Sequence, residues 1–299
     1  MAQATPLALV PAQRQGLPWP GLLLAAGGAI AFSGKAIIVK LAYRHGVDAA
    51  TLIMYRMLFA LPFFVLLSLW AGRGKRGLPL RDWLIVAGLG FSGYYAASML
   101  DFMGLAYISA GLERLILYLG PTLVLLIGVL FFKRRVSRRQ WLALALSYAG
   151  TVIVFGHELH LQGPHVALGA ALVFGSALSY SVYLVASGEV VGRLGALRLT
   201  GLASTVACLL CIGQFLLLHP QDPLASAAVA PTVLWLSLIN GTACTVAPVL
   251  MVMMAIERIG SGLSSQIGMI GPMSTIALGM LLLGSSLVLV GVWLLTRWR

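Results

Sequence analysis

The side chains that could do chemistry are few in this chain, and their spacing forms no catalytic pattern. Its four aspartates are too dispersed for the paired-carboxylate metal sites of membrane transferases; they are Asp48, Asp82, Asp101 and Asp222. The nucleophile motif Gly-x-Ser-x-Gly does not occur. We therefore expect a protein that is not an enzyme.

Two glycine motifs resemble nucleotide sites but stand in the wrong context. Gly88-x-Gly90-x-x-Gly93 has the spacing of a dinucleotide-binding loop, yet no strand precedes it and it lies within an apolar run. Close packing of helices through small residues is the favoured interpretation. The stretch from Gly28 to Lys35 resembles a phosphate-binding loop, but its spacing is one residue too long and no hydroxyl residue follows the lysine. We expect no cofactor.

Neither the histidines nor the cysteines have the spacing of a metal site. One polar loop contains His157, Glu158, His160 and His165, which do not form His-Glu-x-x-His. Cys208 and Cys211 lie inside an apolar run with no second pair to complete a zinc site. A solvated loop and helix packing are the favoured interpretations, so we expect no metal.

Composition indicates an integral membrane protein. Hydrophobic residues make up 60% of the chain and charged residues 9%, whereas roughly a quarter of the residues of soluble domains are charged. The apolar runs are continuous, which favours helices over the alternating strands of a barrel. The net charge of +12 is concentrated in alternate gaps between the runs. It therefore indicates orientation in the bilayer and not binding to nucleic acid.

The apolar runs predict an all-α fold of ten transmembrane helices in two sets of five. A tail at 1–20 precedes the first set at 21–155, a loop occupies 156–165, and the second set occupies 166–299. The expected spans are 21–42, 49–70, 83–109, 111–132, 140–155, 166–187, 197–218, 232–255, 262–283 and 285–296. Both termini are expected in the cytoplasm, because the Lys- and Arg-rich gaps then face it.

The two sets are copies of each other. Two dipeptides recur 151 residues later: Gly111-Leu112 as Gly262-Leu263, and Gly120-Pro121 as Gly271-Pro272. Spans three and four thus correspond to spans eight and nine, which come five spans later. Because successive spans cross the membrane in alternate directions and five is odd, the two copies cross in opposite directions. Inverted repeats of this kind are typical of secondary transporters, which bind substrate near the membrane midplane.

The repeat changes offset after Gly284. The later match of Gly150 with Gly291 leaves about ten residues of the first copy without a counterpart. The last span, 285–296, is also too short to cross a bilayer, which needs ~20 apolar residues. We expect that about ten residues between Gly284 and Ser285 of the natural protein are absent from this sequence.

Ionisable side chains within the spans are candidates for a transport site, because burying them in lipid is costly. Lys35 either contacts substrate or extends to the outer interface. Arg56 either lines the pathway or pairs with Asp101 or Glu113. The sequence leaves both pairs of alternatives open.

Further cavity candidates are aromatic, hydroxyl and methionine side chains at helical spacing. They are Tyr94, Ser98, Tyr118, Tyr180, Tyr183, Met251 and Met269. Ordinary helix packing is the alternative for each one. Together they predict a largely apolar pathway, which suits aromatic or amphipathic solutes better than phosphorylated ones.

Two glycine–proline pairs interrupt spans four and nine. A proline in mid-helix removes a backbone hydrogen bond and kinks the helix, and the preceding glycine loosens the turn. Gly120, Pro121, Gly271 and Pro272 are therefore expected to form hinges for alternating access. Static kinks are the alternative.

On these residues the chain resembles the EamA-like group of the drug/metabolite transporter superfamily. The resemblance rests on Arg56, on the repeated Gly-Leu and Gly-Pro pairs, and on Gly150 and Gly291. Within the group the chain is most similar to the YddG-type exporters of aromatic amino acids. The resemblance implies a bacterial inner-membrane protein that moves neutral amino acids outward through a mostly apolar cavity.

We expect a secondary transporter that exports aromatic and other neutral amino acids by alternating access. Its partners would be a small-molecule substrate and the lipid bilayer, and it would function as a monomer. Efflux of amphipathic drugs or cations is one alternative. A channel-like membrane protein without a substrate cycle is another.

Overall fold

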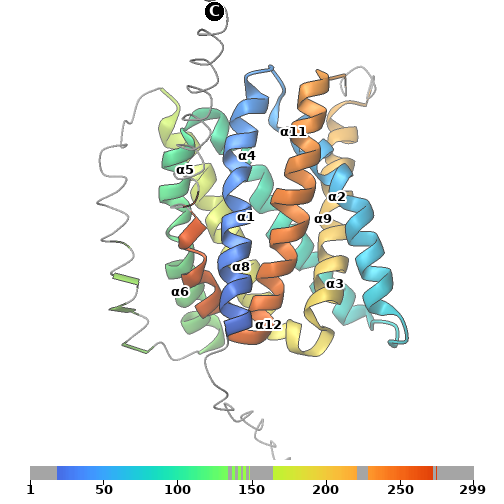
Figure 1. The fold of residues 1–299 in the computed structure, drawn as a ribbon, viewed down its shortest axis with the longest axis vertical. Coiled ribbons are helices and arrows are strands. Elements are labelled where there is room, and N and C mark those ends of the chain that lie inside the picture. The colour runs from blue at the N-terminus through green and yellow to red at the C-terminus, as the bar shows by residue number, and fades with distance from the viewer. Residues whose placement is uncertain are drawn as a thin grey trace, which may run out of the picture.

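The computed structural model describes residues 19–133, 137–138, 141–142, 144–145, 148, 164–220, 228–271 and 274. Within these residues every regular element is helical, and seven segments are long and apolar enough to cross a membrane (Figure 1). Residues 1–18 of the expected tail at 1–20 and the residues around position 284 lie outside the described part. Most of the expected span 140–155 and all of the expected span 285–296 lie outside it too.

The first half of the chain consists of helices joined by short turns. They are α1 (Trp19–Tyr43), α2 (Ala49–Gly72), α3 (Leu80–Gly90), the π-helical η1 (Phe91–Ala96), α4 (Ala97–Tyr107), α5 (Ala110–Leu117) and α6 (Gly120–Phe132). Capping residues mark two of the starts. Asp48 accepts hydrogen bonds from the amides of Ala50 and Thr51 before α2, and Ser109 accepts one from Leu112 before α5.

The second half repeats this order. Its elements are α8 (Val166–Leu194), α9 (Ala196–Leu218), α11 (Pro231–Gly241), the π-helical η2 (Thr242–Val246) and α12 (Ala247–Ile267). Helix α12 carries a sharp break at Gly260, whose φ of 78° and ψ of 161° are not helical. Glycine adopts a positive φ without the steric penalty of a Cβ. Gly260 therefore marks the turn between the spans expected at 232–255 and 262–283.

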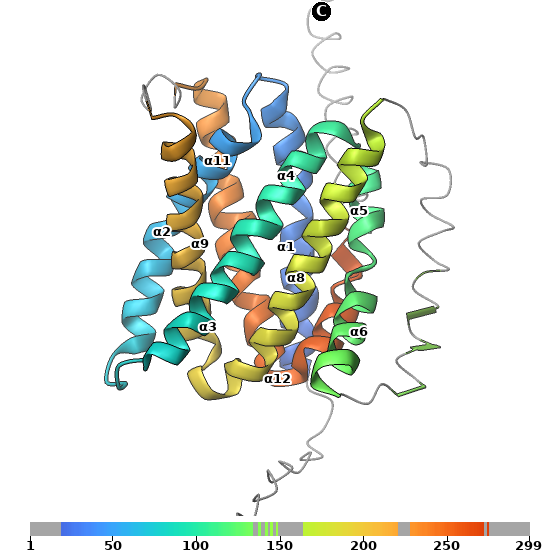
Figure 2. The ribbon, with the colours of Figure 1, turned by 180° about the vertical axis from the view of Figure 1, so that it is seen from behind.

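The boundaries of the elements follow the 151-residue offset. Helices α1 and α8 end at Tyr43 and Leu194, and α3 and α11 begin at Leu80 and Pro231. Even the π-helical segments begin at equivalent positions. Figures 1 and 2 show α1 and α8 running in opposite directions, as do α3–α4 and α11–α12. The copies are therefore inverted, as the odd number of spans predicts.

Each half packs its first helix against the other half. Helix α1 packs against α12, the equivalent α8 packs against α4, and α2 and α9 pack against each other. Gly90 and its equivalent Gly241 permit this approach. A Cβ at Gly90 would lie 2.5 Å from the carbonyl oxygen of Ala203, and one at Gly241 would lie 2.6 Å from that of Arg56. The glycine motif at 88–93 thus serves helix packing.

Candidate substrate cavity

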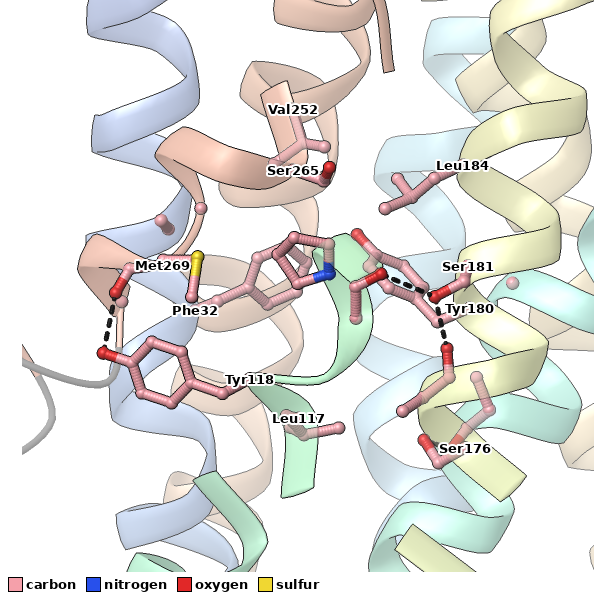
Figure 3. A pocket seen from close by; sticks show the side chains of 18 of the residues that line it. Phe32, Leu117, Tyr118, Ser176, Tyr180, Ser181, Leu184, Val252, Ser265 and Met269 are labelled. Atoms are coloured by element: carbon pink, nitrogen blue, oxygen red, sulfur yellow. Dashed lines mark hydrogen bonds between the residues drawn. The ribbon is translucent and has the colours of Figure 1, made fainter. Parts of the chain in front are cut away.

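A cavity of about 200 Å³ lies between the two halves. Its wall combines residues from both copies, including α1, α4, α5, α8 and α12. Figure 3 shows Phe32, Tyr118, Tyr180 and Met269 around this space. Since a water molecule occupies ~30 Å³ of liquid, the cavity can hold a small organic molecule.

The cavity lies beside the axis that relates the two halves. The Tyr118 hydroxyl donates a hydrogen bond of 2.9 Å to the backbone oxygen of Met269, which is its equivalent 151 residues later (Figure 3). The thiol of Cys208 lies 3.7 Å from the sulfur of Met57, a second pair separated by 151 residues. A residue that contacts its own equivalent must lie near a two-fold axis. Tyr118 and Met269 both line the cavity.

Both halves contain an interrupted helix at this axis. Helix α5 ends at Leu117 and α6 begins at Gly120, while α12 ends at Ile267. Pro121 therefore occupies the first turn of α6, where its missing N–H is tolerated, and the helix of span four is interrupted just before the Gly120–Pro121 pair. Pro272 lies outside the described residues. Interrupted helices at the repeat interface form the binding sites of many secondary transporters.

Serine hydroxyls hold both interruptions. Ser181 of α8 donates to the carbonyl of Gly120 at 3.3 Å. Ser33 of α1 donates to the carbonyl of the equivalent Gly271 at 2.6 Å. Each interruption is thus hydrogen-bonded to the first helix of the opposite half.

Four charged side chains form a buried cluster at the end of the cavity nearer the α1–α2 turn. The Lys35 ammonium contacts Asp101 and lies 3.8 Å from Glu113, and Arg114 lies 3.0 Å from Glu113. Asp101 and Glu113 are buried. The expected alternative for Lys35, extension to the lipid interface, is wrong because its ammonium is paired in the interior.

Arg56 forms no ion pair with a described residue, although pairing with Asp101 or Glu113 was one expectation. Within the described part of the chain no carboxylate lies within 4.0 Å of its guanidinium. Its Nε donates to the Thr245 hydroxyl at 2.7 Å and its Nη1 to the Ser98 hydroxyl at 3.1 Å. Both Arg56 and Ser98 line the cavity.

Three tyrosines of the two halves form one aromatic cluster. The rings of Tyr94 and Tyr180 lie 6.2 Å apart edge to face, and those of Tyr180 and Tyr183 lie 5.6 Å apart and stacked. Tyr94 and Tyr180 line the cavity. Tyr183 does not: it is fully buried behind them against Gly93. In this structure Tyr183 therefore packs behind the cavity wall and does not face the cavity.

Met251 is the second candidate that does not line the cavity. Its side chain packs against Gly27 of α1, where a Cβ would lie 2.4 Å from the methionine methyl carbon. The structure also places several residues in the wall that sequence reasoning missed, among them Phe32, Ser176, Ser181 and Ser264. The repeat could have indicated Ser264, because it is the equivalent of Glu113.

Comparison with known proteins agrees with this arrangement. The model of the EamA-like transporter family matches residues 19–156 and again residues 167–296. An uncharacterized transporter of Bacillus subtilis (strain 168), YcbK, is 29% identical over 278 residues, which cover 89% of this chain and 86% of that protein. A WAT1-related protein of Arabidopsis thaliana, At1g25270, is 26% identical over 212 residues, covering 60% of this chain and 59% of that protein.

A solved crystal structure has the same fold. Its TM-score is 0.69 at 17% sequence identity, over 87% of this chain and 89% of that one. The duplicated family match, the two inverted halves and the cavity between them agree with one another. The chain belongs to the EamA-like transporter family and is a multi-pass membrane protein of the drug/metabolite transporter superfamily, not an enzyme.

Proposed function

We propose that this transporter exports aromatic and other neutral amino acids across the bacterial inner membrane by alternating access. The observation that carries the proposal is the composition of the cavity wall beside the two-fold axis. There Phe32, Tyr118, Tyr180 and Met269 offer aromatic and polarisable surface, which binds aromatic side chains by burial and ring contacts. The sequence resemblance to the YddG-type exporters points the same way.

The proposal includes a complete topology of ten helices with both termini in the cytoplasm. The spans 140–155 and 285–296 would complete the two sets of five, with about ten natural residues missing between Gly284 and Ser285. The transporter would act as a monomer, because each half supplies its own share of one cavity. Gly120, Pro121, Gly271 and Pro272 would be the points about which the interrupted helices bend.

Flux measurements on the purified protein in liposomes test the function. We expect saturable transport of phenylalanine and of tryptophan, and we expect each amino acid to inhibit transport of the other. Transport that rises linearly with concentration would indicate a channel instead. Inhibition by lipophilic cations, without inhibition by amino acids, would indicate efflux of amphipathic drugs.

A further inference from the structure

Arg56 differs from the other cations of the cavity wall in its partners. Lys35 and Arg114 each lie within 4.0 Å of a carboxylate. Arg56, which is only 1% exposed, has neutral hydroxyl partners within the described part of the chain. The wall therefore contains three basic side chains. Two of them are paired with Asp101 and Glu113, and among the described residues the charge without an ion-pair partner is that of Arg56.

A buried charge without a carboxylate in direct contact is costly, because its lost hydration is not fully replaced. The two hydroxyls and the ring of Phe102, whose centroid lies 5.3 Å from the guanidinium carbon, recover part of this cost. Thr245 also donates its own hydroxyl proton to the backbone oxygen of Asn240 at 2.7 Å. Its lone pairs therefore face Arg56 and hold the guanidinium in place.

We propose that Arg56 binds the carboxylate of the transported solute. This inference rests on the proposed function and adds the group by which an amino acid is recognised. A planar guanidinium matches a carboxylate with two parallel hydrogen bonds, and the negative charge of the solute balances the wall of the cavity. Lys35 and Arg114 are less suited, because each would first have to leave its acidic partner.

The position of Arg56 makes this a single site that both halves share. Its equivalent 151 residues later is Ala207, which is buried and uncharged. Its hydroxyl partners come from one half each: Ser98 lies just after η1, and Thr245 lies within η2. π-Helical turns in α-helices are frequent at functional sites. A carboxylate bound to Arg56 would therefore sit between the two equivalent π-helical segments.

The test compares ligands that differ in one group. Calorimetric titration of the full-length protein in detergent would use phenylalanine, phenylalanine amide, phenylethylamine and 3-phenylpropionate. For the wild type we expect the amide and the amine to bind at least about tenfold more weakly than phenylalanine, since a hydrogen bond between charged groups is worth about that factor. Equal binding of phenylalanine and its amide would overturn the inference.

Variants assign the difference to Arg56. In Arg56→Gln, phenylalanine and its amide should bind equally, and Arg56→Lys should restore part of the preference. Arg258→Gln is the matched control, because Arg258 is exposed on α12 outside the cavity, and it should keep the wild-type preference. If Arg56→Gln does not fold, Arg56→Lys, which keeps the charge, replaces it: a preference for phenylalanine over its amide as large as in the wild type would then overturn the assignment to Arg56.

The same panel separates this inference from the proposed function. Binding of 3-phenylpropionate without binding of phenylalanine would support the carboxylate site and contradict amino-acid transport. Binding of phenylalanine and phenylethylamine with equal affinity would support amino-acid binding and contradict the site. Failure of all four ligands to bind would contradict both.

Discussion

At the scale of single residues, the charged side chains in and around the cavity wall differ in whether they have an ion-pair partner. Lys35, Asp101, Glu113 and Arg114 neutralise one another, while Arg56 is held by hydroxyls. The hydroxyl of Tyr118 bonds to the other half at the axis. Two predictions follow from these contacts.

Removing one partner of the Lys35–Asp101 pair should be costly. Because a buried charge left without its partner destabilises a protein by about 3–5 kcal/mol, Lys35→Met and Asp101→Asn should each lower the melting temperature clearly. The double variant, which buries neither charge of the pair, should be more stable than Lys35→Met. A double variant no more stable than either single one would contradict the coupling.

Loss of the Tyr118 hydroxyl should affect transport through the contact between halves. Tyr118→Phe removes one hydrogen bond, worth about 1 kcal/mol, and should change the initial rate of flux by up to about fivefold while substrate affinity changes less. The matched control is Tyr43→Phe. It removes the hydrogen bond of 2.7 Å that the Tyr43 hydroxyl donates to the backbone oxygen of Phe102, within the first half. Equal effects of both variants on flux would contradict the assignment.

At the scale of elements, close helix approach and interrupted helices shape the cavity. Gly90 brings α3 and η1 against α9, and Gly241 brings α11 and η2 against α2. The interruption between α5 and α6 is bonded to α8, and Gly271 is bonded to α1. The next two predictions test these features.

Gly90→Ala should destabilise the protein, because the new Cβ would lie 2.5 Å from a backbone oxygen that cannot move away alone. Overpacking of this kind costs about 1–3 kcal/mol. Gly88→Ala in the same motif is the control, since nothing lies within 4 Å of its Cβ position, and alanine favours the helix. Thermal unfolding in detergent measures both. A Gly90→Ala variant as stable as Gly88→Ala would contradict the packing role.

Proline replacement tests the hinges. Pro121→Ala and Pro272→Ala should slow flux more than they weaken substrate binding, because alanine would favour a continuous helix across the interruption. Flux in liposomes and calorimetric titration measure the two quantities on the same preparations. Equal losses in rate and affinity would indicate static kinks.

At the scale of the whole molecule, the two halves are equivalent in backbone but not in charge. The equivalents of Asp101, Glu113 and Arg114 are Val252, Ser264 and Ser265, and all three line the cavity or its rim without charge. One end of the cavity is thus held by ion pairs and the opposite end is not. The direction of this asymmetry across the membrane depends on the topology.

Cysteine labelling determines that topology. With the termini in the cytoplasm, Arg44→Cys in the α1–α2 turn should react with an impermeant thiol reagent in intact spheroplasts, and Lys75→Cys between α2 and α3 should react only after lysis. Both positions are exposed, and the two connections that contain them, α1–α2 and α2–α3, lie at opposite ends of the bundle (Figures 1 and 2). The native Cys208, Cys211 and Cys244 are buried and give little background. The reverse labelling pattern would contradict the proposed orientation.

Much of the architecture could be predicted from the amino-acid order alone. Hydrophobicity is a local property, so continuous apolar runs located the spans that the structure describes, and duplication preserves spacing, so two dipeptide pairs revealed the repeat. Seven of the nine cavity candidates do line the cavity, Tyr94, Tyr180 and Met269 among them. The odd number of spans in each copy was enough to predict that the two copies cross the membrane in opposite directions.

Side-chain contacts between helices could not be predicted in this way. Sequence spacing does not tell whether Asp101 pairs with Lys35 or with Arg56, nor that Tyr183 and Met251 pack behind the wall. Those outcomes depend on α1 packing against α4 and α12, and on α8 packing against α4 and η1. This packing brings together residues that are far apart in the sequence, such as Lys35 and Asp101 or Gly27 and Met251. The packing of the helices decides which side chains pair, because it determines which buried charges come close enough to neutralise each other.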